Sequence, residues 1–163
     1  MSIIELVGRG VVIGVGGSLT IDAWALFLRR SFGVSGLDYR LLGRWIGHLP
    51  RGQFFHQGIG KARTVRGERA LGWFAHYSIG IGFALALLAW VRSDWLDSPT
   101  ALPALAVGLG TVAAPWLVMQ PAFGMGIAAS RTPRPWMSRL RNLATHAAYG
   151  LGLYLSAVAL AAW

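Results

Sequence analysis

Four long apolar stretches alternate with polar ones along the chain. They cover roughly residues 7–28, 70–91, 101–129 and 142–163. A helix that crosses a membrane needs about 20 predominantly apolar residues, and each stretch reaches that length. The pattern therefore predicts an all-α protein, a four-helix transmembrane bundle that forms a single integral membrane domain over residues 1–163.

The polar stretches between these segments carry nearly all of the positive charge. Thirteen of the fifteen basic residues fall in 29–69 and 130–141, whereas the connection 92–100 holds one basic residue, Arg92, against two acids. Lys and Arg next to spanning segments stay on the cytoplasmic side. We therefore expect loops 29–69 and 130–141 to be cytoplasmic, and the N and C termini to be periplasmic, in a bacterial inner (cytoplasmic) membrane.

The composition agrees with a membrane location. The 163 residues are 55% hydrophobic and 13% charged, with a mean hydropathy of +0.51, whereas a soluble domain has about 25% charged residues. The formal net charge of +9 lies in loops between apolar runs and not on a water-soluble fold, so we expect the lipid bilayer as partner and no nucleic acid. The absence of cysteine excludes thiol–disulfide relays and cysteine metal sites.

The first basic loop contains a short segment, 37–49, with helical periodicity. Its apolar face comprises Leu41, Leu42, Trp45, Ile46 and Leu49. Its basic face comprises Arg40, Arg44 and His48. This pattern predicts an amphipathic helix on the cytoplasmic leaflet, with the basic side chains toward headgroups. The alternative is a specific anion or substrate site on the basic face.

Two further charged residues near the cytoplasmic boundary are candidates for the same role. Glu68 lies at the start of the second span, where it either balances neighbouring arginines or faces a cavity. Arg131 lies in the second basic loop. The cytoplasmic anion or headgroup candidates are therefore Arg44, His48, Glu68 and Arg131. A metal site that combines His48 and His56 with Glu68 is disfavoured, because the histidines lack a recognised ligand spacing.

The third apolar stretch contains two prolines, Pro115 and Pro121. Each removes a backbone hydrogen bond, so the helix should be kinked or partly broken around 111–121. Glycines in the first and third stretches should permit close helix packing. An aromatic belt on the periplasmic side is expected from Trp90, Trp95 and Trp163.

The second and fourth stretches resemble each other. Both carry the pattern His-x-x-x-Gly-x-Gly and both end in Ala-Trp. The pattern comprises His76, Gly80, Gly82 and His146, Gly150, Gly152. The first and third stretches both contain Gly-x-Gly, at Gly14 and Gly16 and at Gly108 and Gly110. These matches indicate a possible parallel two-helix repeat about an axis along the membrane normal.

Three ionisable residues lie inside the apolar stretches: Asp22, His76 and His146. Such groups are expensive in a membrane, so each is a functional candidate. Counted from the flanking arginines at about 1.5 Å per residue, all three lie roughly 8–10 Å inside the cytoplasmic boundary. We expect them to form one intramembrane polar site, joined by Gln120, Tyr77 and Tyr149. The alternative is that each makes only a structural interhelical hydrogen bond.

These residues favour transport of a proton, ion or small solute, since His titrates near neutrality and Asp can pair with it. Four helices make a narrow bundle, so a pathway would need a homodimer. One alternative is a redox protein with His76 and His146 as axial ligands of haem b; no other metal site is expected. The remaining alternatives are an enzyme acting on a lipid-like substrate and a non-catalytic membrane subunit or assembly factor.

Common enzyme signatures are missing from the sequence, including the nucleophile elbow, the zinc helix and the P-loop. We therefore assign no catalytic residue and leave open whether the protein is an enzyme, although a non-enzymatic role is favoured.

Five motifs resemble a known family. They are Asp22-Ala23-Trp24, Gly43-Arg44-Trp45-Ile46-Gly47-His48, the segment 68–77 (ERALGWFAHY), Gln120-Pro121-Ala122-Phe123-Gly124 and Ala128-Ala129-Ser130-Arg131-Thr132-Pro133. Together they resemble an uncharacterised family of small bacterial four-span membrane proteins, domain of unknown function 2938. The resemblance runs nearly end to end. It implies the fold and the membrane location but no activity, so it assigns no catalytic residue.

Overall fold

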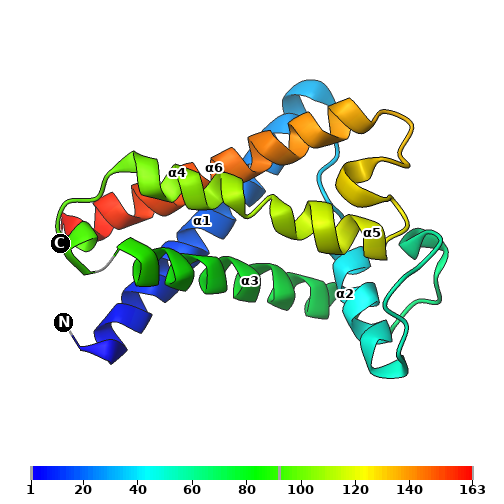
Figure 1. Ribbon diagram of the computed structural model, residues 1–163, viewed down its shortest axis with the longest axis horizontal. Helices are drawn as coiled ribbons and strands as arrows, with labels where there is room; N and C mark the ends of the chain where they lie inside the picture. The colour runs from blue at the N-terminus through cyan, green and yellow to red at the C-terminus, as the bar shows by residue number, and fades with distance from the viewer. Residues whose placement is uncertain (1, 92, 163) are drawn as a thin grey trace. The chain divides into compact units, whose positions relative to one another are not determined.

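The computed structural model describes residues 2–91 and 93–162, and this part of the chain contains helices and no strands. Figure 1 shows the arrangement. The long helices are α1 (Ile3–Phe32), α3 (Glu68–Val91) and α6 (Pro135–Ala161), and the shorter ones are α2 (Tyr39–His48), α4 (Ala101–Gly110), α5 (Gln120–Ala122), η1 (Leu49–Arg51), η2 (Ile59–Lys61), η3 (Ser93–Leu96), η4 (Pro115–Met119) and η5 (Ile127–Ala129). The all-α prediction is confirmed.

Within residues 2–91 and 93–162, four segments are long and apolar enough to cross a membrane: Ile3–Phe32, Glu68–Val91, Ala101–Ala122 and Pro135–Ala161. They confirm a multi-pass membrane protein with four candidate spans. The helical boundaries differ from the predicted ones in the second half. The third segment ends at Ala122 and not at 129, because Gly124 and Gly126 follow it with positive φ, a conformation that does not continue a helix.

The last helix begins seven residues earlier than the apolar pattern predicted. Pro135 is its first residue, and proline suits this position because its fixed φ is helical and its missing N–H would have no helical partner there. Part of the predicted loop 130–141 is therefore the first turns of α6.

The predicted break in the third span is confirmed. Regular α-helix ends at Gly110, and a π-helical turn occupies Pro115–Met119. In this turn the N–H of Gln120 bonds to the carbonyl of Pro115, five residues back, as a π-helix requires. Pro115 and Pro121 lack the N–H groups that a continuous α-helix would use.

The chain forms two compact units, each with most of its contacts within itself. The first comprises Met1–Gly36, Tyr77–Thr111 and Ala144–Trp163, and the second comprises Leu37–His76 and Val112–Leu143. Residues of α3 and α6 belong to both. A single membrane domain over 1–163 stays a prediction.

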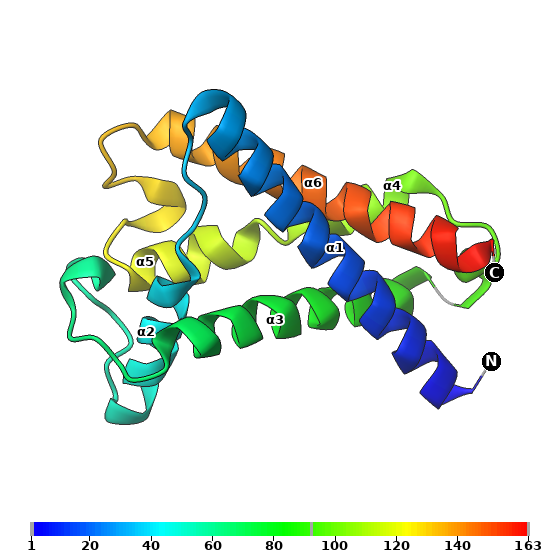
Figure 2. The same ribbon diagram turned by 180° about the vertical axis from the view of Figure 1, so that it is seen from behind.

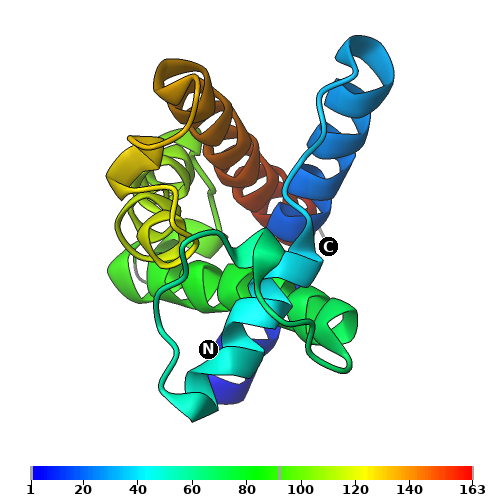
Figure 3. The same cartoon turned by 90° about the vertical axis from the view of Figure 1, so that its right-hand side faces the viewer.

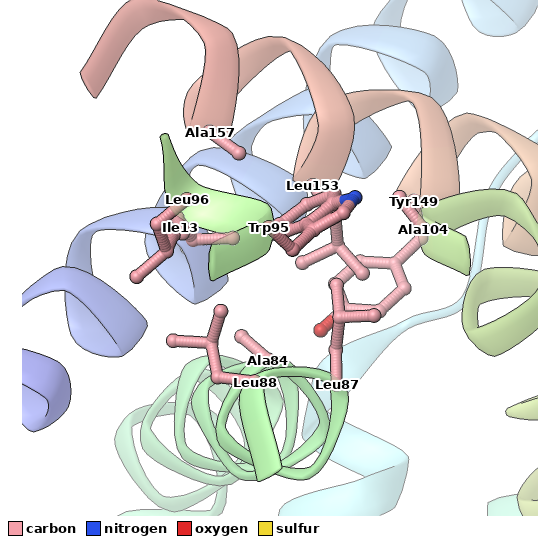
Figure 4. Packing of buried hydrophobic residues seen from close by; sticks show 10 residues of the cluster. All are labelled: Ile13, Ala84, Leu87, Leu88, Trp95, Leu96, Ala104, Tyr149, Leu153 and Ala157. Carbon is pink, nitrogen blue, oxygen red and sulfur yellow. The ribbon is translucent and has the colours of Figure 1, made fainter. Parts of the chain in front are cut away.

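The core of the first unit is drawn in Figure 4. It comprises Ile13, Ala84, Leu87, Leu88, Trp95, Leu96, Ala104, Tyr149, Leu153 and Ala157. Trp95 packs inside this core, and its Nε1 donates to Thr100 Oγ1 at 3.2 Å. Its assignment to an aromatic belt was wrong, because the turn at η3 folds the ring back onto the helices. Trp90 is exposed, in keeping with a belt, and Trp163 lies outside the described residues, as does Arg92.

Glycines allow the helices of the first unit to approach closely, as predicted. A Cβ on Gly14 of α1 would lie 2.5 Å from Ile81 Cα of α3. A Cβ on Gly108 of α4 would lie 2.5 Å from Gly150 Cα of α6. Figure 2 shows α1 crossing α3 and α4 running beside α6. Gly82 and Gly110 have no such neighbour within 4 Å, so only part of each glycine pattern serves packing.

In the second unit α2 packs against the start of α3. Figure 3 shows α2 in cyan, with the chain that follows it. Side chains at Gly43 and Gly72 would collide with the facing backbone, at Glu68 and Tyr39 respectively. The loop after α2 is joined to α5 and the turn after it, because His56 N donates to Ala122 O at 2.9 Å and Ile59 N to Phe123 O at 3.2 Å.

Candidate functional site

Asp22 has a hydrogen-bond partner inside the first unit. The hydroxyl of Tyr77 donates to Asp22 Oδ2 at 2.8 Å, so the bond joins α1 to α3. Both side chains are half-buried. The two residues were predicted to belong to one polar site, and the structure brings these two together.

His146 lies in the same unit but bonds to a different helix. Its Nδ1 lies 2.7 Å from Thr111 Oγ1, at the end of α4. The Thr111 hydroxyl also donates to Gly108 O at 2.6 Å. One helical turn further along α6, the buried Tyr149 donates its hydroxyl to Gly80 O at 2.5 Å.

His76 belongs to the second unit, where it contacts α2. Its Nε2 lies 3.2 Å from the hydroxyl of Tyr39, and the two rings stack with centroids 4.2 Å apart. The ring of Trp73 stands edge-on to His76 at 6.0 Å. A common layer of Asp22, His76 and His146 stays a prediction.

The contacts of His76 are unlike those of an axial haem ligand. Tyr39 occupies both the Nε2 atom and one face of the ring, which a haem iron and its porphyrin would need. These contacts of His76 therefore do not support the haem hypothesis. No group of three or more His, Asp or Glu side chains that could hold a metal ion occurs in residues 2–91 and 93–162.

Gln120 is buried in the second unit, and its side chain bonds to Asn142 of α6. Its Nε2 donates to Asn142 Oδ1 at 2.7 Å, and Trp116 Nε1 donates to the same oxygen at 3.1 Å. Gln120 Oε1 is buried and has no partner in the described chain. Gln120 was predicted to join the Asp22 site, but the partners found for it are Asn142 and the backbone of its own segment.

Arg44 and Glu68 form a buried ion pair in the second unit. Arg44 donates to both carboxylate oxygens of Glu68 at 2.8 Å, and their side chains are 11% and 13% exposed. These hydrogen bonds raise the pKa of Arg44, so the guanidinium stays charged. Glu68 therefore balances an arginine, as one interpretation held, but the partner is Arg44 of α2 and not one of its neighbours in sequence.

The predicted orientation of the basic face of α2 was wrong for two of its three residues. Arg40 is exposed and pairs with Asp38, but Arg44 and His48 are buried. His48 Nδ1 lies 2.6 Å from Gln53 Oε1, and its Nε2 lies 2.8 Å from Arg63 O. The reason is that α2 packs on α3 through Gly43 and Gly72, and this contact turns Arg44 inward.

Arg131 is the remaining anion candidate, and it lines a cavity. This cavity of about 420 Å³ is formed by Phe55, His56, Gln57, Pro121, Gly124 and Arg131, all from the second unit. An adjoining cavity of about 350 Å³ shares Phe55, Pro121 and Arg131. In the sequence, His56 was a candidate only as a metal ligand, and no spacing pattern linked it to Arg131.

The partners of the predicted residues were missed by the sequence analysis. Tyr39, Thr111 and Asn142 bond to His76, His146 and Gln120 respectively. A Thr or Asn near a helix end is common, so nothing in the spacing singled these residues out.

Comparisons with known proteins agree with this architecture without supplying an activity. No curated protein and no solved structure matches the chain. The family described as "Protein of unknown function (DUF2938)" matches residues 11–160, which contain most or all of each of the four candidate spans, and this protein belongs to that family.

Proposed function

We propose that this protein moves a proton, or another small cation or solute, across the membrane through the first unit. The observation that carries the proposal is a series of polar side chains in the interior of that unit. It begins at Asp22, a carboxyl group inside a membrane span with a tyrosine hydroxyl bonded to it. Ionisable residues in spans commonly mark ion and proton pathways.

The series continues along α1 toward α3. Ser18 lies one helical turn before Asp22 and therefore on the same face of α1. Ser18 is fully buried, and its Oγ has no partner in the described chain. It packs directly against Gly80 of α3. A buried hydroxyl beside a polar backbone group is a place where a water molecule can bridge.

The other half of the series lies on α6 and α4. The carbonyl of Gly80 accepts the hydroxyl of Tyr149, and His146 lies one turn before Tyr149 on α6. His146 in turn bonds to Thr111. Carboxyl, hydroxyl and imidazole groups can each pass a proton along a hydrogen-bonded series, as in the proton relays of membrane proteins. All four spans contribute to this series.

The same proposal includes an orientation and a repeat. The charge bias supports periplasmic termini in a bacterial inner membrane. The glycine contacts favour a parallel repeat, since Gly14 packs on Gly80 and Ile81 while Gly108 packs on Gly150. Each contact joins the first helix of a half to the second at corresponding positions of the sequence patterns.

Reconstituted vesicles test the transport function. We expect wild-type protein to acidify the lumen faster than empty vesicles when a potassium gradient and valinomycin impose a negative potential inside. Asp22→Asn should lower the protein-dependent rate more than about tenfold, since it keeps the shape but removes the titrating group. Tyr77→Phe should have a smaller effect of the same sign.

The matched control is Tyr154→Phe, which also removes a phenol hydroxyl from the first unit. Tyr154 packs beside the core and is outside the polar series, so its substitution should leave the rate unchanged. A wild-type rate equal to that of empty vesicles, with potassium and sodium as well as protons, would rule out the movement of protons and of these cations. Equal rates for Asp22→Asn and wild type would exclude Asp22 from the pathway.

A further inference from the structure

The two adjoining cavities in the second unit have a marked excess of positive charge around them. The residue ranges of this unit contain eleven of the fifteen basic residues and only two of the six acids. Both acids already have arginine partners, since Asp38 pairs with Arg40 and Glu68 with Arg44. None of the residues that line the two cavities is acidic, so none of them neutralises Arg131.

His56 adds a second polar group to the larger cavity. Both of its ring nitrogens are buried and without a partner in the described chain. Its neighbour His48, with ring centroids 5.1 Å away, already uses both nitrogens for Gln53 and Arg63. A buried donor without an acceptor is rare enough in proteins to need an explanation, and an anion that reaches the imidazole would supply one.

A strained turn holds Arg131 at the cavity. Ala128 and Ala129 both have positive φ, at 48° and 60°, a conformation that costs energy in residues other than glycine and often accompanies function. Arg139 Nε donates to Ala128 O at 2.9 Å, and Thr132 Oγ1 donates to Ala129 O at 2.8 Å. The N–H of Arg131 itself donates to Met125 O at 2.8 Å.

The exposed edge of the cavities includes two large apolar side chains. Phe55 lines both cavities and is 76% exposed, and Ile127 lines the smaller one and is 62% exposed. Arg131 is exposed beside them, as are Gln57 and Ser130. An arginine next to large exposed apolar side chains suits a ligand with a charged head and an apolar tail.

We propose that this cavity binds a phosphate group, with the Arg131 guanidinium as its main contact and His56 as a second donor. Arginine presents a planar fork that matches phosphate oxygens with two hydrogen bonds. The exposed side chains of Phe55 and Ile127 favour the headgroup of an anionic phospholipid as the source of the phosphate, with these two side chains against the acyl chains. This site is separate from the proposed polar series, which lies in the first unit.

Thermal unfolding of the full chain in a neutral detergent tests the proposal, because a ligand that binds the folded state raises the unfolding temperature, and at a given concentration a tighter ligand raises it more. Three probes are titrated: dihexanoyl phosphatidylglycerol, dihexanoyl phosphatidylcholine and inorganic phosphate. We expect the unfolding temperature to rise with phosphatidylglycerol at concentrations below its critical micelle concentration, and to rise less with phosphatidylcholine. A response to inorganic phosphate of equal strength would assign the site to a soluble phosphate compound, which keeps the phosphate chemistry but changes its source.

Arg131→Gln should weaken the apparent affinity for phosphatidylglycerol about tenfold, the effect of a lost charge-assisted hydrogen-bond pair. Arg134→Gln is the matched control, since Arg134 is an exposed arginine three residues away that lines neither cavity, and it should change the affinity less than about twofold. His56→Leu should weaken binding without lowering the unfolding temperature of the ligand-free protein, because it replaces unsatisfied buried nitrogens by an apolar group.

Two results would overturn the site. One is the absence of any rise in the unfolding temperature of the wild type with both phosphatidylglycerol and inorganic phosphate. The other is an unchanged affinity in Arg131→Gln. Neither result bears on proton movement through the first unit, and loss of transport in Asp22→Asn does not bear on this cavity.

Discussion

Arg44 joins three parts of the second unit that are distant in sequence. It lies in α2, bonds twice to Glu68 at the start of α3, and donates to three carbonyl oxygens of the intervening loop, those of Ile59, Gly60 and Ala62. A guanidinium has five N–H donors in a rigid plane, whereas a lysine has three donors on a single nitrogen. A lysine at this position could therefore not make the same set of hydrogen bonds. Arg44 therefore fixes the loop that also carries His56.

Loss of Arg44 should destabilise the protein strongly. Arg44→Met leaves the Glu68 carboxylate buried without its cation, which costs about 3–5 kcal/mol in comparable buried pairs. Arg44→Met/Glu68→Met should be less destabilised than Arg44→Met alone, because no buried charge remains. The measurement is equilibrium unfolding of the detergent-solubilised protein.

The exposed pair between Arg40 and Asp38 is the control for Arg44. Surface ion pairs contribute less than about 1 kcal/mol, so Arg40→Met should have a small effect. If Arg40→Met and Arg44→Met lower stability equally, the burial of the Arg44 pair is not what stabilises the loop.

Helical periodicity predicted α2 but not the surroundings of its basic face. Arg40, Arg44 and His48 recur every four residues, so the sequence places them on one side of the helix. It does not show that Gly43 and Gly72 allow α3 to pack within backbone contact of α2. That contact depends on residues nearly thirty positions apart, and hydrophobic periodicity reports only on neighbours within the same helix.

At the scale of the elements, two glycines of α3 have opposite roles. A Cβ at Gly72 would collide with the backbone of Tyr39, whereas a Cβ at Gly82 would have nothing within 4 Å. Gly72→Ala should therefore destabilise the protein by about 1–3 kcal/mol or more, since backbone cannot move aside as a flexible side chain can. Gly82→Ala should be neutral or gain up to about 1 kcal/mol, because alanine favours helix.

The measurement is the free energy of unfolding of the two alanine variants under identical detergent conditions. The two variants have the same chemical change in the same helix, so any difference comes from the surroundings. Equal stabilities would show that α2 does not pack on Gly72 in solution. The sequence marked Gly82 as part of a repeated glycine pattern, but pattern alone could not separate a packing glycine from an open one.

At the scale of the whole molecule, the length and polarity of the apolar stretches were sufficient to predict four spans. The positions of Pro115 and Pro121 in the sequence were also sufficient to predict the break in the third span, because a proline lacks the N–H group that a continuous helix uses. The partners of the polar residues could not be predicted in this way. Asp22 and Tyr77 are 55 positions apart and His146 and Thr111 are 35 apart, so their contacts depend on how the helices pack and not on any local pattern.

Charge is distributed unevenly between the two units, and this distribution predicts the orientation of the protein in the membrane. The sequence ranges of the first unit hold four basic and four acidic residues, whereas those of the second carry the whole net charge of +9. Since basic flanks stay in the cytoplasm, alkaline phosphatase fused after Pro99 or at the C terminus should be active in a bacterial host. Fusions after Gly33 or Pro133 should be inactive, because that enzyme folds only outside the cytoplasm. Activity after Gly33 with none at the C terminus would reverse the orientation, and with it the side of the membrane that supplies the phosphate ligand to Arg131.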